Sequence, residues 1–216
     1  MDRHSEGRRT RSLSIAGGAA FLAAAQWILL VIVAETRYPG YSVAANFLSD
    51  LGATCHRGLA ATPCVIVDTP SLIWNTTLSL LGLLSLVAAV FFYRATRRRA
   101  FTISFAIFGT GALVAGVVPE TLLSVHETAS LLSFLGGGVA AILATRFLKT
   151  PINLFSAVLG ALALIATVVV AFQGPFFRWN GVFGLGLGGI ERMVVYPLVI
   201  WEIGFGSAIA MVADRT

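Results

Sequence analysis

Charged side chains are scarce in this sequence. They make up 12% of the 216 residues, whereas a soluble domain carries about 25%. Hydrophobic residues make up 57% and form long runs between the few charges, which excludes a soluble domain. The net charge of +5 does not indicate nucleic-acid binding, because Lys and Arg stand beside apolar runs, where they set membrane topology. We therefore expect an all-α, polytopic integral membrane protein with no nucleic-acid partner.

Six apolar runs are each long enough to cross a bilayer, which takes about 20 residues. The first run is too long for the core of a signal peptide, and the polar residues that follow it do not form a small-residue cleavage site. We expect one bundle of six transmembrane helices over residues 13–216, preceded by a mobile basic tail at 1–12 and interrupted by one long polar loop at 35–69. The expected spans are 13–34, 71–93, 100–118, 128–148, 152–172 and 193–212.

The positive charges are unevenly distributed between the two ends of these spans. One end carries the basic tail, the arginines at 94–99, Arg146, Lys149 and Arg215, while most acidic residues fall at the other end. The positive-inside rule places the basic end in the cytoplasm. We therefore predict a multi-pass plasma-membrane protein with both termini in the cytoplasm. The loop at 35–69, the turn at 119–127 and the loop at 173–192 then face outward.

Several familiar chemical motifs are missing. Only two of the three histidines, His56 and His126, fall on the outer side, so a site with three histidine ligands is excluded there. His126-Glu127 lacks a second histidine at the spacing of the zinc-protease helix. The glycine-rich stretch 181–189 follows no strand, so we interpret it as a place of close backbone packing and not as a nucleotide loop. The sequence thus predicts no metal site and identifies no cofactor.

The polar residues of the long loop are the first candidates for a binding site. As a short helix, this stretch would present Val43, Phe47 and Leu51 on one face. Asn46 and Asp50 would share another face, with Ser49 beside them, and Gly52 would end the helix in a left-handed conformation. The alternative is an interfacial helix whose polar face meets only water.

Four further polar residues are predicted at the same membrane level, from three different spans. Arg192 suits a carboxylate or phosphate headgroup, because its planar group donates two parallel hydrogen bonds. Since an unpaired charge at that depth is costly, we expect the carboxylate of Asp50 to lie within about 12 Å of the guanidinium of Arg192, roughly a Debye length. The alternative is that each charge reaches water separately. The four residues are Asn75, His126, Glu191 and Arg192.

Two more features stand apart from that group. Cys55 and Cys64, the only cysteines, both fall in the outward loop, where an oxidising compartment favours a disulfide over two free thiols. Glu202 is expected near the middle of the membrane, where an ionisable side chain is either functional or hydrogen-bonded to another helix. Ser79 and Asn75 of the second span are the partners we expect in the second case.

The motif Asn46-Phe47-Leu48-Ser49-Asp50-Leu51-Gly52 resembles a bacterial and archaeal membrane family catalogued as domain of unknown function 998. Further residues carry the resemblance over most of the chain. They are Asn75, Gly116 with Pro119 and His126, and the run Gly189-Ile190-Glu191-Arg192. The resemblance implies an integral membrane protein of the six-helix type. It implies no activity.

The sequence leaves three functions open. The first is an outer-leaflet site for a lipid-like or amphiphilic ligand, with membrane lipids as partners. In a catalytic form of that site, Asp50 or His126 would act as the base in hydrolysis or transfer on a lipid, with or without a metal. The second is a proton-coupled carrier that uses Glu202, and the third is a membrane scaffold. The oligomeric state is left open by the sequence.

Overall fold

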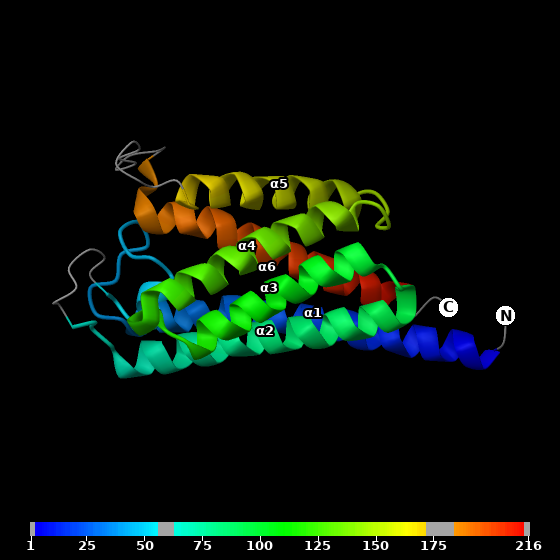
Figure 1. Ribbon diagram of the computed structural model, residues 1–216, viewed down its shortest axis with the longest axis horizontal. Coiled ribbons are helices and arrows are strands. Elements are labelled where there is room, and N and C mark those ends of the chain that lie inside the picture. Colours follow the sequence, from blue (N-terminus) through cyan, green and yellow to red (C-terminus); the bar gives the residue numbers. More distant parts are fainter. Residues whose placement is uncertain (1–2, 56–62, 172–183, 214–216) are drawn as a thin grey trace.

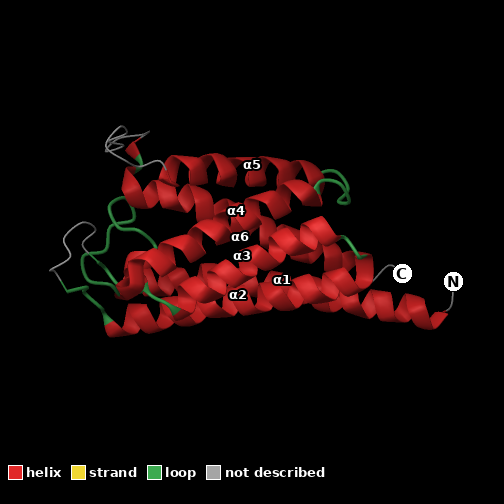
Figure 2. Ribbon diagram, viewed as in Figure 1, coloured by secondary structure: helices red, strands yellow, loops and turns green. Residues whose placement is uncertain are grey.

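The computed structural model describes residues 3–55, 63–171 and 184–213. It is built from helices, and the described residues form no β-strand (Figure 2). Two short 3₁₀ helices lie between the long ones. The elements are α1 (Arg3–Arg37), η1 (Ser49–Leu51), α2 (Asp68–Thr96), α3 (Arg99–Val117), η2 (Glu120–Leu122), α4 (Leu123–Ala144), α5 (Ile152–Ala171) and α6 (Gly186–Ala213).

The six long helices form a closed ring in chain order. Each packs against the next, and α6 packs back against α1 (Figure 1). We call the end of the bundle where α1 begins and α6 ends the terminal end. The opposite end, which carries η1, η2 and the long connection between α1 and α2, is called the loop end. All six helices are long and apolar enough to cross a membrane, which confirms the predicted fold class.

The largest differences from the predicted spans are at the starts of the first and last helices. Residues 3–12 of the predicted mobile tail belong to α1, which begins at Arg3, because the arginine-rich stretch favours helix and contains no proline. The last helix begins at Gly186, seven residues before the predicted start at Met193. This extra part of α6 is where the segment between α1 and α2 docks.

Glycines permit close contact between neighbouring helices. A Cβ at Gly82 of α2 would lie 2.5 Å from the carbonyl oxygen of Gly109 in α3. A Cβ at Gly206 of α6 would lie 2.7 Å from the carbonyl oxygen of Gly17 in α1. Since real side chains do not approach a backbone this closely, any larger residue would push the helices apart.

Towards the terminal end, aromatic rings fill the interior of the ring of helices. The ring centroid of Phe101 lies 4.7 Å from that of Phe92 and 5.1 Å from that of Phe205, so the rings are in direct contact. Phe105 and Trp201 extend the same group. We call these five residues the aromatic cluster. All five are buried, so this part of the interior is apolar.

Candidate functional site

The segment Ser42–Gly52 covers the interior of the bundle at the loop end, and we call it the capping segment. The predicted amphipathic helix does not form, because only Ser49–Leu51 is helical, as the 3₁₀ helix η1. Val43 is 53% exposed whereas Leu51 is fully buried, so the two do not share a face. The segment folds instead around hydrogen bonds from its polar side chains and from α6.

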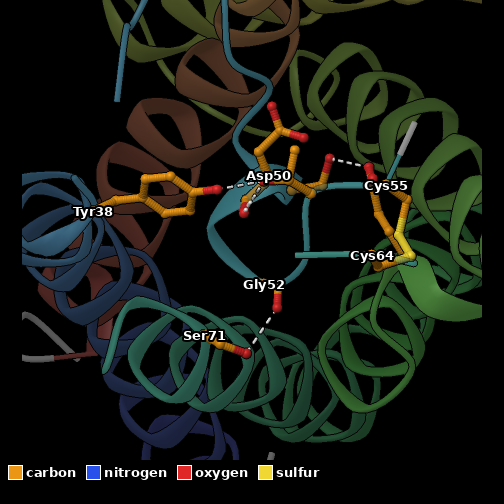
Figure 3. The surroundings of a disulfide bond; sticks show 9 residues. Tyr38, Asp50, Gly52, Cys55, Cys64 and Ser71 are labelled. Atoms are coloured by element: carbon orange, nitrogen blue, oxygen red, sulfur yellow. Dashed lines mark hydrogen bonds between the residues drawn. A yellow bond between two sulfur atoms is a disulfide. The ribbon is translucent and has the colours of Figure 1, made fainter. Parts of the chain in front are cut away.

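The sequence suggested that Gly52 ends a helix in the left-handed conformation, and the structure contradicts this. The φ of Gly52 is −79°, which any residue can adopt. Glycine is needed here because a Cβ would lie 2.7 Å from Cδ1 of Trp74 and 2.9 Å from Oδ1 of Asn75. The carbonyl of Gly52 accepts a hydrogen bond from Ser71, at 2.7 Å (Figure 3). Asn75 donates to the hydroxyl of Ser71. Ser71 therefore anchors the capping segment on α2, and Asn75 positions Ser71.

Asp50 organises the turn of the capping segment. Its Oδ2 accepts hydrogen bonds from the side-chain amide of Asn46 and from the backbone N–H of Phe47, each at 3.0 Å. Asn46 in turn accepts the N–H of Ser42 through Oδ1. The predicted proximity of Asn46 and Asp50 at i, i+4 is thus present, although the backbone between them is not a regular helix.

Arg192 fastens the capping segment to α6. Nη1 donates to the backbone carbonyls of Val43, at 2.9 Å, and Asn46, at 3.1 Å. Nη2 forms an ion pair with Glu35 at 2.6 Å and donates to the hydroxyl of Tyr41 at 2.6 Å. Arg192 is only 3% exposed. Its ion-pair partner is therefore Glu35, and its bond to the Asn46 carbonyl links it to the turn that Asp50 organises.

These contacts bear on the ligand-binding role predicted for Arg192. Nη1 and Nη2 both donate within the protein. Nε is buried and has no hydrogen-bond acceptor among the described residues. Using Nη1 or Nη2 for a ligand would leave two carbonyls without this donor and the largely buried carboxylate of Glu35 without its ion-pair partner. Arg192 therefore holds the capping segment in place, and contact between Arg192 and a ligand stays a prediction.

Tyr41, which lies outside the membrane-spanning helices, links Arg192 to the capping segment. Its hydroxyl donates to the carbonyl of Phe47 at 3.0 Å and accepts from Arg192. Burial raises the pKa of the Tyr41 phenol above its ordinary value, and the neighbouring Arg192 opposes that rise only in part. The phenol consequently stays neutral and keeps the proton that it donates to Phe47.

The first turns of α6 receive the capping segment directly. The backbone N–H of Gly188 donates to the carbonyl of Ala44 at 3.0 Å, and Glu191 accepts the N–H of Leu48. A Cβ on Gly186 or Gly188 would collide with the carbonyl oxygens of Ala44 and Asn46. The structure thus confirms close backbone packing at these two glycines, while Gly181 lies outside the described residues.

Ser49 faces the interior, where it meets a carboxylate that is distant in sequence. Its hydroxyl donates to Oε1 of Glu120, at 2.5 Å, and both side chains are buried. The sequence supplies no base beside Ser49, but the fold brings Glu120 from η2 into contact with it. A hydroxyl held by a carboxylate is the arrangement that general-base activation requires.

His126 stands at the start of α4, 4% exposed. Its Nδ1 lies 2.8 Å from the carbonyl oxygen of Val118, which follows the last residue of α3. Because a carbonyl can only accept, Nδ1 must carry the proton. In the neutral ring, Nε2 then has a lone pair that can accept a proton or a hydrogen bond. The hydrogen bond through Nδ1 therefore leaves Nε2 for other partners.

Beneath the capping segment lies a cavity of about 40 Å³. A water molecule needs roughly 10–15 Å³ of such space, so the cavity has room for two or three waters or the tip of a larger group. Its wall is largely apolar, with polar side chains from η1, α4 and α6. The polar lining residues are Ser49, His126, Ser130, Ser133 and Glu191, with Trp27 and Trp74 among the rest.

Two buried indole N–H groups belong to this wall. Nε1 of Trp27 and Nε1 of Trp74 have no hydrogen-bond acceptor within the described part of the chain. Their rings meet edge to face, with centroids 5.8 Å apart. An unsatisfied buried donor costs about 1–3 kcal/mol, so an acceptor that reached either N–H would remove that penalty.

A groove of about 510 Å³ adjoins the cavity at the loop end. It runs between α4 on one side and α5 and α6 on the other, with an apolar wall that includes Leu131, Val170 and Leu187. The cavity and the groove share five lining residues. These are Ser49, His126, Ser130, Phe134 and Glu191.

The predicted site residues thus divide into two groups. Ser49, His126 and Glu191 line the cavity and the groove. The other four predicted residues, Asn46, Asp50, Asn75 and Arg192, position the capping segment.

The remaining two predictions concern the disulfide and Glu202. Cys55 and Cys64 form a disulfide just after the capping segment (Figure 3). Glu202 is completely buried, and its hydrogen-bond partner on α2 is Ser85, at 2.7 Å, not Ser79 or Asn75. The predicted partners are wrong because Ser85, farther along α2, stands at the level of Glu202.

Sequence reasoning left Glu35, Tyr41 and Glu120 out of the site. Each lies at the edge of an apolar run, and the need of Arg192 for a counter-charge is the one signal that could have pointed to Glu35. Among the described residues, no group of three His, Cys, Asp or Glu side chains is placed to hold a metal ion.

Comparison with curated proteins gives no match, and comparison with solved structures gives none either. One family model does match, over residues 21–208, and its description is protein of unknown function DUF998. The matched region runs from α1 to α6 and includes the capping segment, the cavity and the groove. The chain therefore belongs to the DUF998 family.

Proposed function

We propose that this protein binds a hydroxyl-bearing amphiphile at the loop end of the bundle. The hydroxyl end of the headgroup enters the cavity, and the apolar chain lies along the groove between α4, α5 and α6. The observation that carries the proposal is the continuity of the two spaces. Ser49, His126 and Glu191 line both, so one molecule can touch polar groups with one end and an apolar wall with the other.

The chemistry of the wall favours a neutral headgroup. Nε2 of His126 and the carboxylate of Glu191 accept hydrogen bonds, whereas the indoles of Trp27 and Trp74 donate them. A hydroxyl group can do both. A phosphate or carboxylate headgroup would instead meet the carboxylate of Glu191, which lines both spaces, while Nη2 of Arg192 is paired to Glu35. Repulsion between like charges in a buried site disfavours such a ligand.

A binding role suits the interior better than a carrier role. A proton-coupled carrier needs polar groups along a path between the two ends of the bundle. Glu202 and Ser85 would be the middle of that path, but the aromatic cluster occupies the interior between them and the terminal end. The polar side chains therefore favour a site open at one end.

The same proposal places the loop end outside the cell and both termini in the cytoplasm of a plasma-membrane protein. Its support is the charge pattern, since the terminal end carries arginines from α1, the turn after α2 and the turn after α4. A cytoplasm-active reporter fused after Thr216 should be active. A silent cytoplasmic reporter at that position, together with activity of a reporter that works only in the periplasm, would show the opposite orientation.

Tryptophan fluorescence gives a direct test of ligand binding. The protein would be purified in detergent with Trp179 and Trp201 replaced by phenylalanine, so that only Trp27 and Trp74 report. Brominated diacylglycerol quenches tryptophan at short range, and it should quench saturably and be displaced by unbrominated diacylglycerol. Brominated phosphatidic acid with the same chains should quench much less, because its headgroup is anionic.

Two variants of α4 make the test specific. His126→Asn removes Nε2 while keeping an amide that can donate to Val118, and it should weaken binding about tenfold, the equivalent of one buried hydrogen bond. Thr128→Ala is the matched control, since Thr128 is exposed and bonds only to its own helix. Equal, non-saturable quenching by both lipids would refute the proposal.

A further inference from the structure

A second groove lies at the terminal end of the bundle, far along the helices from the capping segment. It has a volume of about 690 Å³ and is bounded by the start of α1, the turn between α2 and α3, and the turn between α4 and α5. The proposed amphiphile site does not use it. Nothing in the function proposed above depends on this groove.

Three cations stand at the rim of this groove, each from a different part of the chain. Arg9 comes from α1, Arg98 from the turn before α3, and Lys149 from the turn before α5. All three side chains are exposed. No acidic side chain is among the lining residues that the structure describes. The described part of the rim is therefore positively charged and contributes no acidic side chain.

The floor of the groove is apolar. Leu13, Phe147, Ile152 and Met211 belong to it, together with Phe92 of the aromatic cluster. The guanidinium of Arg98 lies over the Phe147 ring, 4.7 Å from its centroid, which holds the charge at the boundary between rim and floor. A positive rim above an apolar floor matches a molecule with an anionic head and a hydrocarbon chain.

Two helix starts add to the positive field. Arg98 immediately precedes α3, and Ile152, the first residue of α5, lines the groove. The positive end of a helix dipole favours anions, in addition to the side-chain charges. A general excess of cytoplasmic arginine explains the number of charges, but not their position around an apolar floor.

We infer that this groove binds an anionic phospholipid, with the phosphate among Arg9, Arg98 and Lys149 and an acyl chain against the floor. Charge complementarity selects the occupant. Basic pockets between helices on the cytoplasmic side of membrane proteins are suited to anionic lipid heads. The ligand differs in charge from the one proposed for the loop end, so the two sites can be tested separately.

Native mass spectrometry of the full-length protein in a neutral detergent can measure this binding. Phosphatidylglycerol and phosphatidylcholine with identical chains would be titrated separately, and phosphatidylglycerol should bind much more tightly. The R98Q/K149Q variant should lose about 30-fold in affinity for phosphatidylglycerol, at roughly five- to sixfold per basic residue. Binding of brominated diacylglycerol at the loop end should be unchanged.

The R99Q/R146Q variant is the matched control. It removes two arginines from the same end of the bundle, but neither Arg99 nor Arg146 lines the groove. It should keep wild-type affinity for phosphatidylglycerol. An equal loss of affinity in both double variants would mean that general charge attraction explains the binding, and it would overturn the inference. Displacement of the lipid by millimolar inorganic phosphate alone would also overturn it, because the acyl chain would then contribute nothing.

Discussion

Replacing Arg192 with methionine should detach the capping segment from α6. The side chain of Arg192 is 4% exposed and that of its partner Glu35 is 16% exposed, so the ion pair is largely buried. Removing one member of a buried pair costs about 3–5 kcal/mol, mainly because the other charge is left without compensation. Two carbonyls of the capping segment, on Val43 and Asn46, lose their donor at the same time.

A double-mutant cycle separates the charge from the hydrogen bonds. Glu35→Gln keeps an acceptor oxygen beside Arg192 but leaves that buried cation without its counter-charge, so it should also cost about 3–5 kcal/mol. In the double variant the orphaned carboxylate is gone, and the loss should fall short of the sum of the single losses by at least about 1 kcal/mol. Reversible unfolding in mixed micelles, followed by circular dichroism, measures each free energy of unfolding.

Arg37→Met is the control for this cycle. Arg37 is an exposed arginine at the same end of α1, and its loss should change the free energy of unfolding by less than about 0.5 kcal/mol. An equally small change in the free energy of unfolding for Arg192→Met would refute the role of Arg192 in holding the capping segment. Strict additivity of the two substitutions would also refute it, since independent residues do not share a pair.

Three further predictions concern packing and protonation. Gly52→Ala should destabilise the protein by about 1–3 kcal/mol through overpacking, whereas Gly204→Ala, where a Cβ meets nothing within 4 Å, should be neutral or stabilising in the same unfolding assay. Glu202→Gln should change the free energy of unfolding by less than about 1 kcal/mol. The amide keeps the contact with Ser85, and a buried carboxyl without a cation is expected to be neutral. A gain of several kcal/mol would instead indicate that Glu202 carries a buried charge. The raised pKa of Tyr41 adds stability that is complete below the phenol's unfolded pKa of about 10 and is lost as pH rises through the higher folded value. The wild type should therefore lose stability above about pH 10, and Tyr41→Phe should lose less over that range; equal alkaline losses would contradict this.

The spanning helices could be predicted from sequence because they depend on local composition. Apolar runs of about 20 residues between charges are sufficient to identify helices in lipid, where every backbone group must be bonded internally. The capping segment could not be predicted in this way. Its conformation depends on Arg192 and Glu191, which are more than 140 positions away in sequence.

The same reasoning explains the mixed outcome at the site. Asn46, Ser49, Asp50, His126, Glu191 and Arg192 do gather at one end, because all lie at the boundaries of spanning helices. Their roles could not be assigned, since both Asp50 and Arg192 are charged and either could have faced a ligand. Only the contacts distinguish a carboxylate that holds a turn from a hydroxyl, such as that of Ser49, that lines a cavity.

The measurement that tests the central claim most directly is the identification of lipids that leave the membrane with the protein. Protein isolated gently from its own membrane would be extracted, and the lipids quantified by mass spectrometry against the bulk membrane. A hydroxyl-headed amphiphile should be enriched at close to one per chain with the wild type and Thr128→Ala, and depleted with His126→Asn. If all three samples carry lipids in the proportions of the bulk membrane, the cavity and groove at the loop end do not form a binding site.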